Sequence, residues 1–156
     1  MSDIFAVSTT AAIALVASTA KTILEIKAPT NHRVKILRWA VFFDEETGDA
    51  TPSIPLLAEL LKITVTGTGS ANTPILARPA SETIQTTAKD NFTVEGTLTD
   101  VYDQAIVNAQ TGYEVIFPMG QEVIVAGGDL IGIRITPGSV ISTGGLKVTA
   151  KIWFEE

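Results

Sequence analysis

The chain has 156 residues and a net charge of −6, with 46% apolar and only 18% charged residues. One histidine and no cysteine exclude disulfides and thiolate metal sites. An acidic chain repels phosphate groups, which argues against nucleic acid and anionic membranes as partners. A chain of this length is expected to form a single domain. Its low content of charged residues indicates that the domain covers part of its apolar surface against other subunits.

The N-terminal residues differ from the rest, because Ala, Ser and Thr dominate them and Asp3 is their only charge. This composition disfavours a helix, so we expect an extended arm or an edge strand over residues 1–20, ahead of a domain over residues 21–156. Residues 11–20 resemble a signal-peptide core, but no positive charge precedes them, and secretion is not expected. The apolar residues of the arm are candidates for binding a partner: Ile4, Phe5, Val7, Ile13, Leu15 and Val16.

Alternation of apolar and polar residues begins at Lys21 and predicts a series of strands. The first two are expected over residues 22–28 and 33–44, the second with a β-bulge at Ile36–Leu37, where the inward phase changes. Within residues 54–66, the leucines at positions 56, 57, 60 and 61 are spaced as on one face of a helix, whereas residues 63–66 alternate as in a strand. We prefer a strand, and the choice over residues 54–62 stays open.

The second half of the chain continues this pattern, after a long loop expected over residues 67–79. Gly127-Gly128-Asp129 is a hairpin turn signal. The last strand alternates strictly, with Trp153 outward between Ile152 and Phe154. About eight to ten antiparallel strands without a clear helix predict an all-β jelly roll or β-sandwich. The remaining strands are expected over residues 82–88, within 98–107, and over 113–118, 122–126, 130–136 and 146–154.

The sequence offers few groups for catalysis. His32 lies in a turn and has no second histidine to complete a zinc site, so we interpret it as a solvated turn residue. Gly67 and Gly69 begin like a dinucleotide-binding loop, but the third glycine is missing and Pro74 stands where the helix should start. We therefore expect no enzyme activity, no cofactor and no metal.

Acidic residues form two further candidates. Asp44, Glu46 and Asp49 suggest calcium, but their spacing does not match an EF-hand, so we expect a solvated acidic loop, with an irregular calcium site as the alternative. Asp100 and Asp103 resemble a glycosidase carboxylate pair, but two acids in an apolar strand region carry little weight.

Two aromatic residues face away from the expected core. Phe42 lies opposite in phase to Val41 and Phe43, and Trp153 lies opposite to its neighbours. Interfaces are enriched in Trp and Phe, so we predict that both make subunit contacts. A second covered face within the monomer and a stacking platform for a sugar are the alternatives.

Several stretches carry a family resemblance: residues 25–29 (EIKAP), 33–39 (RVKILRW), 73–74, 79, 82–87 (ETIQTT), 110–113 (QTGY) and 118–128 (PMGQEVIVAGG). Together they resemble small jelly-roll proteins that are encoded among bacteriophage head genes and decorate the capsid as trimers. The resemblance covers most of residues 21–154. It implies a capsid decoration (cement) protein, similar to tumour-necrosis-factor-like trimers, made in the host cytoplasm and carried on the exterior of the virion. Its partners would be the major capsid protein and further copies of itself.

The expected arm fits a clamping role only with help from its backbone. Twenty extended residues reach about 65 Å, enough to cross a neighbouring subunit. Its buried side chains would gain about 1.5–3 kcal/mol each, whereas ordering costs about 1–2 kcal/mol per residue, so strand addition has to supply the difference. The alternative function is a tail or baseplate module that binds host glycans through Trp153, Tyr113 or Trp39. Head or tail location, and an arm acting in cis or swapped between protomers, both stay open.

Overall fold

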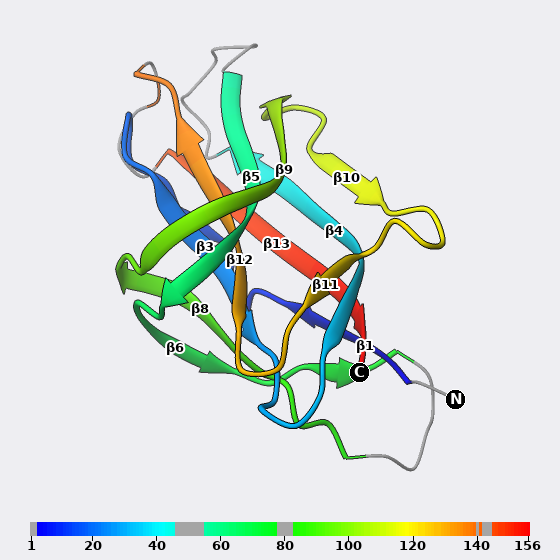
Figure 1. Ribbon diagram of the computed structural model, residues 1–156. Coiled ribbons are helices and arrows are strands. Elements are labelled where there is room, and N and C mark those ends of the chain that lie inside the picture. Colours follow the sequence, from blue (N-terminus) through cyan, green and yellow to red (C-terminus); the bar gives the residue numbers. More distant parts are fainter. Residues whose placement is uncertain (1–2, 46–54, 78–82, 140, 142–144) are drawn as a thin grey trace.

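The computed structural model describes residues 3–45, 55–77, 83–139, 141 and 145–156. Within these ranges the chain forms thirteen strands and no helix (Figure 1), which confirms the all-β class. Their bounds are β1 Ile4–Ser8, β2 Ile13–Ala14, β3 Lys21–Lys27, β4 Val34–Glu45, β5 Pro55–Val65, β6 Thr68–Asn72, β7 Ile75–Leu76, β8 Thr87–Val94, β9 Thr97–Asn108, β10 Tyr113–Ile116, β11 Val123–Val125, β12 Leu130–Pro137 and β13 Leu146–Glu155. The count exceeds the expected eight to ten because β2, β7 and β11 have only two or three residues.

The strands form two antiparallel sheets packed as a sandwich, an arrangement consistent with a jelly roll. Sheet A has the order β10-β4-β13-β1-β7, with β11 also pairing with β4 and β2 with β13. Sheet B has the order β6-β8-β3-β12-β5-β9. In Figure 1, β13 and β4 run behind β12 and β5, so the long central strands of the two sheets cross face to face.

The core fills the space between the sheets with side chains from alternate positions. In β13 the alternation is complete, and all of its inward residues are 0–1% exposed: Leu146, Val148, Ala150, Ile152 and Phe154. In β12, Ile131, Ile133 and Ile135 face them in the same way. Burial of such aliphatic side chains contributes about 1.5–3 kcal/mol each, which fixes which face of each strand points inward.

Two local predictions are confirmed. Trp153 pairs with Arg38 and Phe154 pairs with Ile36, so Leu37 is the extra residue of a bulge in β4. Residues 55–65 form strand β5, which pairs with both β12 and β9. The leucines of β5 form two adjacent pairs, Leu56-Leu57 and Leu60-Leu61, a spacing that also fits a helix, and within the strand Leu56, Ala58 and Leu60 face the core.

The prediction of a loop over residues 67–79 is wrong, because strands β6 and β7 lie within this range. Gly69 looked like a loop signal, but it serves the packing of a strand. A Cβ atom on Gly69 would lie 3.1 Å from the Phe92 ring, so glycine leaves room for that ring over β6. The strand expected over residues 82–88 is also displaced, since β8 begins at Thr87.

The hairpin expected at Gly127-Gly128-Asp129 is wrong as well. Strand β11 pairs with β4 in sheet A, whereas β12 pairs with β3 and β5 in sheet B. The turn therefore carries the chain from one sheet to the other. Gly128 adopts φ of 87°, and its amide donates to the carbonyls of Ala28 and Pro29 at 3.2 Å. The residues of a turn set its local geometry but not the sheet that the next strand joins.

The N-terminal residues, for which an extended arm or an edge strand was expected, form two short strands in the described chain. Strand β1 lies in sheet A between β13 and β7, and β2 pairs with β13. β13 offers a free edge that these residues fill, so their apolar side chains complete the core of the described chain. Of the candidate arm residues, Phe5, Val7, Ile13 and Leu15 are buried, Ile4 is half-buried, and Val16 is exposed.

Candidate interaction surfaces

A row of side chains crosses the outer face of sheet A at one level. The strand register pairs Ile116 with Arg38, Arg38 with Trp153, Trp153 with Ala6, and Ala6 with Ile75. Directly paired residues share a face of the sheet, so all five project away from the core. Ile75 and Ile116, at the two ends, are each 66% exposed. We call these five residues the transverse row; it is apolar at both edges of the sheet.

The centre of the transverse row is a cluster of cations around an aromatic ring. The Arg38 guanidinium lies 3.8 Å, and the Lys151 ammonium 4.5 Å, from the centre of the Trp153 ring. Arg38 also forms an ion pair with Glu114 on β10. Contacts between cations and aromatic rings contribute about 0.5–1 kcal/mol at exposed sites. Trp153 is therefore a half-buried, held side chain rather than an open stacking platform.

Phe42 lies on the same outer face as Trp153. It pairs with Thr149 on β13 and is 48% exposed. The two residues predicted to make subunit contacts are thus brought to one surface, separated along β4 by the four positions from Arg38 to Phe42. No prediction from the sequence alone placed them on one surface with Arg38 and Lys151, because that requires the register of β4 with β13.

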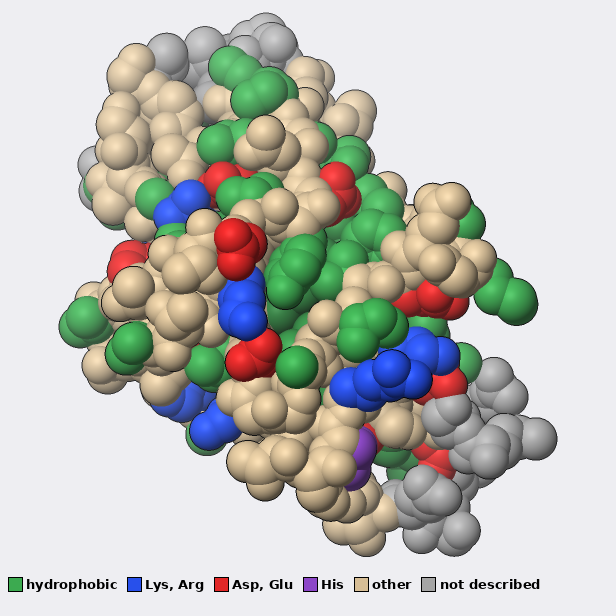
Figure 2. All heavy atoms as spheres, viewed as in Figure 1, with side chains coloured by type: hydrophobic (Ala, Val, Ile, Leu, Met, Phe, Trp, Pro, Cys, Tyr) green, Lys and Arg blue, Asp and Glu red, His purple; other side chains and the backbone are tan. Residues whose placement is uncertain are grey.

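A second apolar surface lies at the open side of the sandwich. Figure 2 shows hydrophobic side chains gathered between β9 on one side and β10 and β11 on the other. Strand β9 ends sheet B and is twelve residues long. On it, Val101, Tyr102 and Ile106 are exposed, Ile106 to 71%. A long edge strand with exposed apolar side chains is a template for pairing with another chain.

Beneath this open side, aromatic residues of sheet A contact β9. The fully buried Trp39 donates its indole N–H to Asp103 Oδ2 at 3.0 Å, and the Tyr113 ring packs edge-on against it at 5.2 Å. Burial raises the pKa of the Tyr113 hydroxyl, and the nearby Asp103 carboxylate raises it further. These contacts tie the two sheets together. They also occupy Asp103, so it is not one of a free pair with the exposed Asp100.

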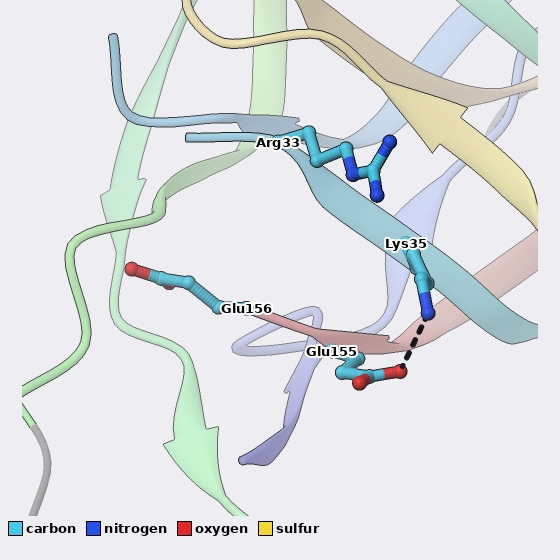
Figure 3. Close-up of a pocket in the computed structure, with 4 residues that line it drawn as sticks. All are labelled: Arg33, Lys35, Glu155 and Glu156. Atoms are coloured by element: carbon cyan, nitrogen blue, oxygen red, sulfur yellow. Dashed lines mark ion pairs between the residues drawn. The ribbon is translucent and has the colours of Figure 1, made fainter. Parts of the chain in front are cut away.

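A charged hollow of about 220 Å³ lies at the end of β13, lined by Arg33, Lys35, Glu155 and Glu156. Figure 3 shows Lys35 and Glu155 turned toward each other, joined by an ion pair of 3.5 Å. Arg33 extends over the hollow from the start of β4 (Figure 3). With two cations and two carboxylates, the hollow has balanced formal charge and no evident preference for a charged ligand.

Glu156 holds two loops rather than a ligand. Its Oε1 contacts His32 Nε2 at 3.0 Å and accepts the Gln85 amide at 2.9 Å, while Oε2 accepts the Thr86 amide at 3.0 Å. Burial favours the neutral acid, but the hydrogen bonds from Thr86, His32 and Gln85 outweigh it and lower the pKa of Glu156. His32 is therefore a half-buried partner of Glu156, which the interpretation as a solvated turn residue missed.

Several buried carboxylates were also missed by sequence reasoning, because acids in alternating strands read as outward-facing. Glu59 pairs with Arg134 at 2.8 Å, as a cross-strand pair between β5 and β12. Glu25 accepts the Thr66 hydroxyl at 2.7 Å. Burial raises the pKa of Glu25, and the Thr66 hydrogen bond and the Lys89 and Lys27 charges oppose that rise.

The described residues contain no group of three or more acidic or histidine side chains placed to hold a metal ion. Of the candidate calcium ligands, Asp44 is exposed at the end of β4, and Glu46 and Asp49 lie outside the described residues.

No helix of the described chain is long and apolar enough to cross a membrane. Comparisons with models of protein families, with curated proteins and with solved structures found no match to this chain.

Proposed function

We propose that this protein is a structural decoration protein of a bacteriophage head, which works as a homotrimer on the outside of the capsid and reinforces it. This role is suggested by the resemblance that residues 25–29, 33–39, 73–74, 79, 82–87, 110–113 and 118–128 carry. The β-sandwich fold agrees with it, and the role needs surfaces for contact rather than reactive groups.

The transverse row is the observation that most favours self-association. It places exposed isoleucines at both edges of sheet A and a cation-bound Trp153 between them. Phe42 adds a further exposed ring to the same face. Aromatic, aliphatic and arginine side chains of this kind are enriched in the centres of protein interfaces. We assign this face to contacts between protomers.

Light scattering during size-exclusion chromatography tests the assembly. The wild-type protein should elute as a trimer. Ile116→Asp would place a charge in the interface and raise the dissociation constant at least about tenfold. Met119→Asp, at a 96% exposed site just beyond β10, is the matched control and should leave the trimer unchanged. A wild-type monomer would contradict the proposal.

Co-sedimentation with shells assembled from the major capsid protein of the same virus tests the location. The wild-type trimer should pellet with undecorated shells at a saturable stoichiometry. The alternative, glycan binding, is less well supported, because Trp39 is fully buried and cations contact Trp153. Glycan-array binding that is lost in Trp153→Ala, with no binding to shells, would favour that alternative.

A further inference from the structure

The N-terminal segment, residues 3–15, lies along the whole length of β13. Strand β1 pairs with Lys151–Glu155, and β2 pairs with Lys147 and Val148. Between them, the Thr9 amide donates to the Ala150 carbonyl at 3.0 Å, and the Leu15 amide continues to the Leu146 carbonyl at 2.9 Å. On its other side, the described residues that pair with the segment belong to the two-residue strand β7, after which the Ala77 amide donates to the Ile4 carbonyl at 2.8 Å. It is thus a ribbon bound mainly to one strand.

A short turn, residues 16–20, joins this segment to β3, and its backbone is strained. Ser18 adopts φ of 54°, in the left-handed region that residues other than glycine rarely occupy. The turn is closed by a hydrogen bond of 3.2 Å from the Thr19 amide to the Val16 carbonyl. Short connections under strain favour exchange of the element that they attach.

The same turn is loosely packed. It borders a hollow of about 400 Å³, which Val16, Thr19, Ala20 and Lys21 line from one side and residues 91–93 and 95 of the β8 region from the other. Val16 is 42% exposed. Ala17 packs against the core and the Ser18 amide donates to the Gly138 carbonyl at 3.3 Å, but most of the turn is exposed, although the segment that it attaches is firmly bound.

The site that binds the segment consists of the edge of β13 and the side chains of Asn72 and Asp90, and we call it the β13 groove. The two polar side chains make this groove specific for the segment. Asp90, fully buried, accepts the Thr10 amide at 2.6 Å and the Asn72 side-chain amide at 3.0 Å. Asn72 also donates to the Ser8 carbonyl at 2.7 Å. Ser8 is the last residue of β1 and Thr10 follows it, so these hydrogen bonds form only when the end of β1 lies beside Asn72 and Asp90. They therefore fix the position of the segment along β13.

We infer that residues 3–15 are exchanged between protomers, so that the segment of each chain occupies the β13 groove of its neighbour. This inference rests on the proposed homotrimer. Every contact of the groove is kept on exchange, while straightening of residues 16–20 releases the strain at Ser18. Only residues 16–20 span the two protomers, and five extended residues reach about 17 Å, so exchange requires the neighbouring groove to begin within that distance of β3.

Cysteine pairs test the exchange, because the chain has no cysteine of its own. Ser8 and Lys151 are directly paired between β1 and β13, at a separation that suits a disulfide. The variant Ser8→Cys/Lys151→Cys is oxidised and run on a non-reducing denaturing gel. Ala14→Cys/Lys147→Cys is a second, independent pair between β2 and β13. Asp44→Cys/Lys147→Cys, between β4 and β13, is the control that cannot exchange.

With exchange, the first two variants should give covalently linked trimers, whereas the control gives only monomers. Thiol titration verifies that each pair has oxidised. Monomers with fully consumed thiols in both test pairs would overturn the inference. If light scattering still shows a trimer in that case, the exchange is wrong and the proposed assembly stands; a wild-type monomer would contradict both.

Discussion

Phe5 offers the most direct test of whether the N-terminal segment completes the core. Its side chain is 2% exposed, and its ring stacks on Phe154 with the centroids 5.7 Å apart. Removal of a buried phenylalanine side chain costs about 3–5 kcal/mol, including the cavity that it leaves. A domain of this kind has about 5–15 kcal/mol of total stability. Phe5→Ala should therefore remove at least about a fifth of the stability of a typical domain.

The assay is urea unfolding followed by circular dichroism, at one fixed protein concentration, since association also contributes to stability. In a separate thermal unfolding experiment, the melting temperature of Phe5→Ala should lie about 6–20 °C below that of the wild type, at about 2–4 °C per kcal/mol for a chain of this size. A double-mutant cycle with Phe154→Ala should show a coupling of about 0.5–1.5 kcal/mol between the rings.

Val16→Ala, at a 42% exposed position in the turn that follows the segment, is the control and should change the free energy of unfolding by no more than about 0.5 kcal/mol. A loss below about 1 kcal/mol in Phe5→Ala, or no coupling to Phe154, would refute the placement of β1 in the core.

Two further predictions concern the loops. The lowered pKa of Glu156 means that its hydrogen bonds, including the one with His32, stabilise the fold above about pH 5 and are lost as the pH falls through its folded pKa. In pH-dependent urea unfolding, the stability advantage of wild type over Glu156→Gln should shrink on acidification; a constant difference would contradict this. Gly112 adopts φ of 66°, and a Cβ atom there would lie 2.7 Å from the Val41 carbonyl oxygen. Gly112→Ala should lower the free energy of unfolding by more than Gly120→Ala, whose φ of 86° adds only the strain of about 1–2 kcal/mol in open space; equal losses would disprove the clash.

The alternation of apolar and polar residues predicted a strand correctly where one of its faces is buried and the other is not. In β13, each inward residue is apolar and each outward one is polar or amphipathic, so local sequence was sufficient. The bulge at Leu37 was also visible, because an extra residue shifts the alternation of every residue after it.

The surfaces were less predictable, because they depend on which strands become neighbours. Sequence analysis found that Phe42 and Trp153 face outward, but the cations around Trp153 come from the register of β4 against β13. The position of the N-terminal segment depends on a neighbouring strand in the same way. Its residues look like an arm when they are considered alone, and they become a core strand only because the edge of β13 is free to bind them.

The two tryptophans project from opposite faces of sheet A, Trp39 into the core and Trp153 outward. Each is therefore a separate optical probe. The cations beside Trp153 attract iodide, so in a dissociated protomer this anion should quench the outer indole and leave the emission of the inner one unchanged. Any molecule that covers the outer face will shield Trp153 from the quencher while the chain stays folded, which makes docking visible without a label.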